Sequence, residues 1–187
     1  EDELIVILQK GITSIPDIKN ITIEPIDDSL LKGNVNIVRK VRINGKPFVV
    51  RMHPRGIKNG YYYVEKAVQL LVKNHGIPTP RILEIHEAKD ESDMDFALVT
   101  KEEGEAMDVY LKKHKDSESG LLFSVGLYLA KIHEIKVTGF GAFNNGLAMK
   151  DGSLIGLHKK YKDFIHTGLE ENLERLVHFE IITKIQA

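Results

Sequence analysis

The dipeptide Asn44-Gly45 lies between two runs of alternating character, NVNIVRKVRI (34–43) and KPFVVRM (46–52). Both central positions of a two-residue type I′ turn require positive φ, which Asn and Gly tolerate, so the dipeptide is a strong hairpin signal. It therefore predicts an antiparallel pair of strands. A change of phase at Val38 and Val41 is compatible with a bulge in the first of them.

Further strand and helix signals surround this hairpin. Short alternating or apolar runs predict strands within 20–27, 81–88 and 95–100. Apolar residues at helical spacing predict a short helix over 3–11 and a longer one over 61–75, which ends at Gly76 and the prolines of IPTP. The order of three strands, one helix and two strands predicts an antiparallel sheet with one inserted helix.

The second half of the chain has a different pattern. Beyond about Gly104 no strand pattern is found and helical periodicity takes over, with a long helix around 124–135 and one or two helices between about 157 and 185. The expected fold class is therefore α+β. We expect an N-terminal lobe over residues 1–101, followed over 102–187 by a hinge and the first helices of an incomplete second lobe.

Composition argues against several classes of function. The 26 Lys and Arg residues nearly balance the 27 Asp and Glu residues, so bulk charge favours neither nucleic acid nor an anionic membrane as a partner. No cysteine is present, which excludes disulfides and thiolate metal sites. The sequence has no apolar run of about 18 residues, and its opening is acidic where a signal peptide would be basic. We expect a soluble, cytoplasmic protein.

Arg51 stands in its predicted strand at a position where an apolar residue was due. Val49 and Arg51 share one face of the strand, and Phe48, Val50 and Met52 share the other. An arginine near a strand end can simply lay its stem on apolar surface and keep its charge in water. The strand alone leaves that interpretation open.

The order of these segments resembles the aminoglycoside phosphotransferase and related small-molecule kinase family, which has the protein kinase-like fold. The resemblance extends over roughly residues 21–176 and depends on five pieces in the right order, because none is specific alone. These pieces are GNVN (33–36) as the nucleotide loop G-x-x-N, FVVRM (48–52) as the third strand, VEKAVQLLVKNHGIPTPRIL (64–83) as the helix and loop behind it, FALVTKEEGE (96–105) as the hinge and VGLYLAKIHEIKVTGFG (125–141) as the first long helix of the C-terminal lobe.

The resemblance implies that Arg51 holds the α- and β-phosphates of a nucleotide. It also implies a carboxylate opposite Arg51, for which Glu65 is the candidate at the flank of the inserted helix's buried face. A glutamate in a first helical turn is also favoured by the helix dipole alone. Gly33 and Asn36 would shape the loop over the nucleotide, although both are ordinary turn residues.

The resemblance further implies that the purine bonds to the backbone of about Thr100 and Glu102 in the hinge. Relatives usually have a glutamate where Thr100 stands and an aromatic where Lys101 stands, which leaves the hinge register open by one residue.

The implied activity is phosphoryl transfer from ATP or GTP, with Mg²⁺, to a hydroxyl of a small molecule, and in this family it includes antibiotic resistance. The family's catalytic loop, His-Gly-Asp with an Asn five residues on, is not found. Two partial matches, 114–116 (HKD) and 93–95 (DMD), precede the positions where the motifs should lie, and we reject both.

We expect the catalytic residues to lie beyond Ala187, because the chain starts without Met and stops within a predicted helix. The alternative is a catalytically inactive kinase-like module that binds a nucleotide or a protein. A longer encoded chain containing the catalytic loop would favour the enzyme. The acceptor, the choice of ATP or GTP and the oligomeric state stay open.

Overall fold

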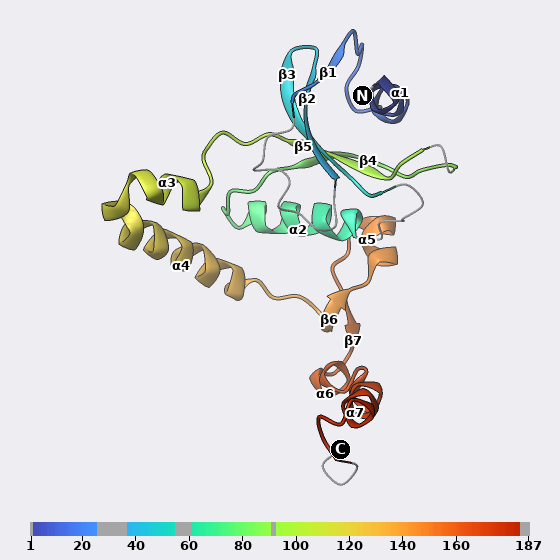
Figure 1. The fold of residues 1–187 in the computed structure, drawn as a ribbon, viewed down its shortest axis with the longest axis vertical. Coiled ribbons are helices and arrows are strands. Elements are labelled where there is room, and N and C mark those ends of the chain that lie inside the picture. The colour runs from blue at the N-terminus through green and yellow to red at the C-terminus, as the bar shows by residue number, and fades with distance from the viewer. Residues whose placement is uncertain (1, 26–36, 55–60, 91–92, 184–187) are drawn as a thin grey trace. The chain divides into compact units, whose positions relative to one another are not determined.

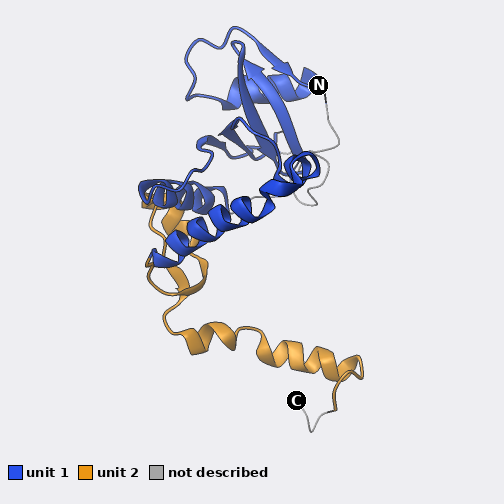
Figure 2. Cartoon of the chain, turned by 90° about the vertical axis from the view of Figure 1, so that its left-hand side faces the viewer, with its two compact units in different colours: residues 1–135 blue, residues 136–187 orange. Residues whose placement is uncertain are grey.

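The computed structural model describes residues 2–25, 37–54, 61–90 and 93–183 of the 187-residue chain. The chain divides into two compact units, residues 1–135 and 136–187 (Figure 2). The lobe boundary near residue 101 stays a prediction. None of the helices within the described ranges is long and apolar enough to cross a membrane.

The first unit is built on a five-stranded antiparallel sheet with the strand order β1-β2-β3-β5-β4 (Figure 1). One helix, α2, is inserted between β3 and β4, and α1 precedes the sheet. These elements are α1 (Asp2–Gly11), β1 (Ile21–Ile23), β2 (Ile37–Ile43), β3 (Lys46–Met52), α2 (Tyr62–Asn74), β4 (Ile82–His86) and β5 (Phe96–Thr100). The α+β class and the predicted order of strands and helix are confirmed.

The β2–β3 hairpin has the turn that its sequence predicts. Asn44 and Gly45 both have positive φ, 51° and 79°, and Ile43 pairs with Lys46. The register runs without a shift from there to Ile37 and Met52, so the bulge considered for β2 is not present in Ile37–Ile43. The change of phase arises because Arg39 occupies a position on the same face as Val41.

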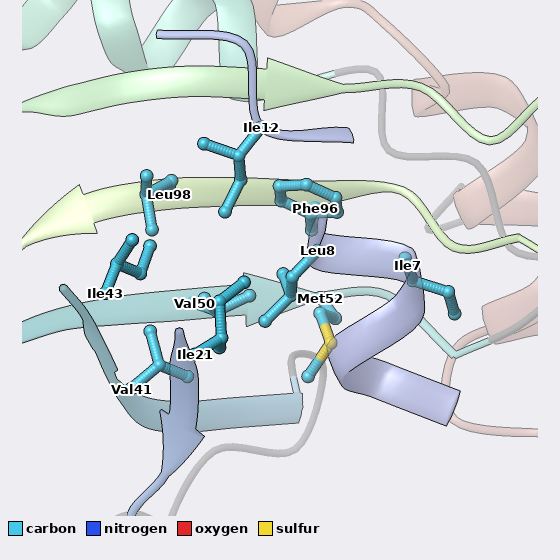
Figure 3. Close-up of a cluster of buried hydrophobic side chains, with 10 residues drawn as sticks. All are labelled: Ile7, Leu8, Ile12, Ile21, Val41, Ile43, Val50, Met52, Phe96 and Leu98. Carbon is cyan, nitrogen blue, oxygen red and sulfur yellow. The ribbon is translucent and has the colours of Figure 1, made fainter. Parts of the chain in front are cut away.

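The two faces of the sheet pack against different helices. On one face, residues of β1, β2, β3 and β5 pack with α1 into a core that includes Leu8, Val50 and Phe96 (Figure 3). On the other face, Tyr62 of α2 packs with a smaller cluster of β4 and β5 residues. Alternation along β3 therefore directs Val50 to the α1 face and Arg51 to the α2 face.

The rest of the first unit is helical, with α3 (Met107–Lys113), a 3₁₀ turn (Lys115–Ser117) and α4 (Glu118–Glu134). The second unit contains β6 (Phe140–Phe143), α5 (Asn145–Asp151), β7 (Gly156–His158), α6 (Tyr161–Ile165) and α7 (Leu169–His178). The long helix predicted around 124–135 and the helices predicted after 157 are confirmed.

The expectation that no strand follows Gly104 was wrong, because β6 and β7 pair as a two-stranded sheet. Strands of three and four residues offer too few positions for alternation to be detected. Gly139 and Gly141 also have positive φ, 83° and 81°, which interrupts regular extended backbone.

Candidate functional site

Arg51 and Glu65 form a bidentate ion pair between β3 and α2. The Nη1 of Arg51 lies 2.5 Å from Oε2 of Glu65, and Nη2 lies 3.2 Å from Oε1. The structure thus confirms the predicted pairing of these two side chains. Their part in binding a nucleotide stays a prediction.

Local structure explains why the two side chains meet. Arg51 points to the α2 face because of the alternation along β3, and Glu65 lies in the first turn of α2. Two side chains of α2 attach this helix to the sheet: the Tyr62 hydroxyl donates to the Arg51 carbonyl at 2.8 Å, and the Gln69 Oε1 accepts from the Ile82 N–H at 2.8 Å. The helix is therefore fixed on both sides of Glu65.

The Arg51–Glu65 pair is only partly shielded from water. The side chains of Arg51 and Glu65 are 27% and 35% exposed, respectively. An ion pair with this much exposure to water adds only about 0–1 kcal/mol to the stability of the fold, so the pair contributes little to folding. A guanidinium carries five N–H donors, and within the described part of the chain Glu65 takes one from each of two nitrogens. The remaining donors and the access to solvent suit a second anion.

Apolar residues lie beside this cation on the same face of the sheet. Val49 is two residues from Arg51 along β3, pairs with Val99 of β5 and packs against the smaller core cluster. Ala97 and Val99 are buried in that cluster, at 0% and 5% exposed, whereas Val49 is half-buried. Of these three apolar side chains, Val49 is the one that keeps access to solvent beside the cation. The period-two pattern places Val49 and Arg51 on one face of the strand, but it assigns Val49 no role.

Thr100 connects the end of β5 to the linker and to β4. Its N–H donates to the Arg81 carbonyl, and its hydroxyl accepts from the Arg81 N–H, both at 2.9 Å. The same hydroxyl donates to the exposed Glu102 carboxylate at 2.8 Å. The predicted purine contacts of Thr100 and Glu102 stay predictions, and the N–H of Thr100 is already bonded within the protein.

Gly33 and Asn36, the predicted nucleotide-loop residues, lie outside the described residues.

The two rejected partial motifs have structural explanations. Residues 114–116 are exposed, and the two aspartates of residues 93–95 accept hydrogen bonds from nearby residues. Asp93 accepts from the ring of His86 at 2.7 Å, and Asp95 accepts from the Ala88 N–H at 2.7 Å. Burial raises the pKa of Asp93, but hydrogen bonds, from His86 first, outweigh burial and hold this pKa below its ordinary value.

Sequence reasoning missed Tyr62, the middle residue of three consecutive tyrosines. The run 61–64 (YYYV) opens the helix predicted over 61–75, and the sequence alone assigned its tyrosines no role in the site. Tyr62 starts α2, is 1% exposed and contacts Arg51 directly. The signal available in the sequence was its spacing of three residues before Glu65, which puts both on one side of the helix.

Comparisons with known proteins identify the family of this chain. A search of the curated proteins found no match. A solved structure from Ralstonia eutropha JMP134, provisionally named an aminoglycoside phosphotransferase, is similar to 57% of this chain at 18% identity with a TM-score of 0.38. The match covers 29% of that protein, so the matched part of this chain spans less than a third of its length. The family model described as the phosphotransferase enzyme family matches residues 30–164. The chain belongs to the phosphotransferase enzyme family.

Proposed function

We propose that this chain is the nucleotide-binding part of a small-molecule kinase. The reaction is the transfer of the γ-phosphate of ATP or GTP to a hydroxyl group of the acceptor. The observation that carries the proposal is the bidentate Arg51–Glu65 pair at the junction of β3 and α2, in a chain of the phosphotransferase family.

In this proposal Arg51 binds the α- and β-phosphates. Glu65 holds two guanidinium nitrogens, which fixes the orientation of the cation, and the other N–H groups donate to phosphate oxygens. Phosphoryl transfer depends mainly on positioning and on the stabilisation of negative charge, and a fixed cation supplies both at the phosphates that do not move.

The same proposal places the purine beside Val49, next to the end of β5. Val49 is half-buried and lies on the α2 face of the sheet with Arg51, and the linker after Thr100 follows β5 directly. Backbone groups of the linker near Glu102 would bond to the edge of the ring. Gly33 and Asn36 would contribute to the loop over the phosphates.

Phosphotransferases of this family generally use Mg²⁺ with ATP. Within the described ranges, no group of three or more His, Asp or Glu side chains is arranged to hold a metal ion. Mg²⁺ in such enzymes is usually held by one or two carboxylates together with the phosphates and water, and the role proposed for Arg51 involves the phosphates alone.

The direct test is isothermal titration calorimetry of ATP and GTP with the wild-type chain and with Arg51→Ala. We expect the substitution to weaken binding about 10- to 100-fold, because hydrogen bonds from a charged group contribute about 1.5–3 kcal/mol. Arg51→Lys retains the charge and should recover part of the loss.

Arg42→Ala is the matched control. Arg42 also lies on a strand and pairs with a glutamate, Glu24, at 3.0 Å, but it faces Pro47, four residues and about 13 Å from Arg51 along β3. Its substitution should leave the affinity for ATP unchanged. Equal affinity of wild type and Arg51→Ala would contradict the proposed site. Tight binding with no transfer to any hydroxyl compound in the full-length protein would favour the binding module instead.

A further inference from the structure

Tyr62 lies between the two elements that carry the Arg51–Glu65 pair. It is the first residue of α2, and its side chain is among the most buried of the large ones, with 1% exposed. Its hydroxyl donates to the backbone carbonyl of Arg51 at 2.8 Å. Tyr62 therefore connects the start of α2 to the same residue that Glu65 contacts three positions later.

The ring of Tyr62 also contacts the cation itself. The guanidinium carbon of Arg51 lies 5.7 Å from the centre of the ring, within the range of a cation–π interaction. The imidazole of His53 packs against the same ring edge to face, at 5.8 Å and 62°. The ring is thus fixed by packing, and it restricts where the guanidinium can lie.

Arg51 is therefore held in three places: at its carbonyl by the Tyr62 hydroxyl, beside its guanidinium by the Tyr62 ring, and at two nitrogens by Glu65. A free arginine side chain samples many rotamers, and a ligand that fixes it must offset the lost entropy. Three contacts that exist before a ligand binds remove most of that cost. They also keep the donors of Arg51 in one place.

We propose that Tyr62 is a positioning residue for Arg51: it sets the place of the phosphate-binding cation by joining the start of α2 to β3. This inference depends on the proposed nucleotide site. It adds that the affinity for the phosphates depends on a hydroxyl that itself touches no nucleotide. The neighbouring tyrosines do not share this role, since Tyr61 is 62% exposed and Tyr63 is half-buried beside Glu87, just after β4.

The experiment compares Tyr62→Phe with Tyr63→Phe. Both remove one hydroxyl and keep the ring, but only the first removes the bond to Arg51. Two readouts are measured: the affinities for ADP and adenosine by calorimetry, and the rotation rate of the Arg51 guanidinium by NMR without ligand. Adenosine lacks the phosphates, so its affinity reports general damage to the site.

We expect Tyr62→Phe to weaken ADP binding about three- to tenfold, the size of one lost hydrogen bond, and to leave adenosine binding unchanged. We also expect faster rotation of the Arg51 guanidinium. Tyr63→Phe should change none of these quantities.

Three results would overturn the inference. The first is a Tyr62→Phe chain in which both the guanidinium rotation rate and the ratio of ADP to adenosine affinity equal those of wild type. The second is a Tyr63→Phe chain that shows the changes expected for Tyr62→Phe, and the third is a Tyr62→Phe chain that does not fold. The last would make the hydroxyl a general requirement for structure. If the wild type binds neither ligand, the proposed function fails, and the rotation rate alone then decides the role of Tyr62.

Discussion

At the scale of single residues, Glu84 shows how a charged side chain organises a connection. This β4 residue accepts hydrogen bonds from the Thr13 hydroxyl at 3.0 Å, the Thr13 N–H at 3.2 Å and the Ser14 N–H at 2.7 Å. Burial raises the pKa of Glu84, but the bonds from Ser14 and Thr13 outweigh burial and leave this pKa below its ordinary value. The ionised form of Glu84 thus attaches the segment after α1 to the sheet.

The direction of this pKa shift predicts a dependence of stability on pH. A carboxyl whose pKa is lower in the folded state adds stability above its unfolded pKa, about 4.3, and loses it as the pH falls through the folded pKa. The free energy of unfolding should therefore decrease less between about pH 5 and pH 3 in Glu84→Gln than in wild type. Urea denaturation at several pH values measures this difference.

The control for this prediction is Glu103→Gln, which changes an exposed glutamate in the linker after β5. It should retain the wild-type pH dependence. Identical pH profiles for Glu84→Gln and wild type would show that the three hydrogen bonds do not stabilise the ionised carboxylate.

The residues of the candidate site differ in how far the sequence predicts them. The Arg51–Glu65 pair could be predicted because the two-residue period of the strand and the 3.6-residue period of the helix direct both side chains to one face. The family resemblance supplied a reason for the two side chains to meet. The bond from Tyr62 to the Arg51 carbonyl could not be predicted, since it depends on how α2 packs on β3. The Thr100–Arg81 bonds likewise depend on the β4–β5 register.

At the scale of elements, the end of α1 shows packing overriding helix propensity. Gly11 is buried where α1 meets the sheet, and a Cβ at this position would lie 2.7 Å from Cε1 of Phe96 and 2.8 Å from Cγ of His86. These two rings are stacked at 4.9 Å, so neither can move aside freely. A residue without a side chain is required at this contact.

We predict that Gly11→Ala destabilises the chain. Alanine favours a helix over glycine by about 1 kcal/mol, but overpacking a filled site costs about 1–3 kcal/mol, and the cost should exceed the gain here. Thermal unfolding followed by circular dichroism measures the net effect as a lower Tm.

Gly126→Ala in α4 is the matched control for Gly11→Ala. Among the described residues, no atom of another element lies within 4 Å of a Cβ at Gly126, so propensity alone should act and helicity should be equal or higher. A Gly11→Ala chain at least as stable as wild type would contradict the packing of α1 on the sheet.

The elements predicted well are those with a strong period or a specific turn. The β2–β3 hairpin and α2 correspond closely to their predicted ranges, whereas α4 was predicted as a helix but begins at Glu118, six residues before the predicted start at 124. The strand predicted within 20–27 is shorter, Ile21–Ile23, and residues 26–27 lie outside the described ranges. The strands β6 and β7 were missed because their pairing joins segments separated by a helix, α5, and no local period records that.

At the scale of the whole molecule, every described residue of the candidate site lies in the first unit. Arg51, Glu65, Thr100 and Glu102 all fall within residues 1–135. The fold class was predictable because local sequence patterns indicate the order of strands and helices. The elements of the second unit were harder to predict, since its short strands have weak local signals.

The proposed nucleotide site depends on the Arg51 guanidinium binding the phosphates. The most direct measurement follows the Arg51 Nε–H resonance in a ¹H–¹⁵N NMR spectrum, assigned by its loss in Arg51→Lys, while ATP or adenosine is added. We predict that ATP shifts this resonance and saturates it, whereas adenosine does not. An Arg51 resonance that stays unchanged while ATP binds, or the absence of ATP binding, would contradict the account.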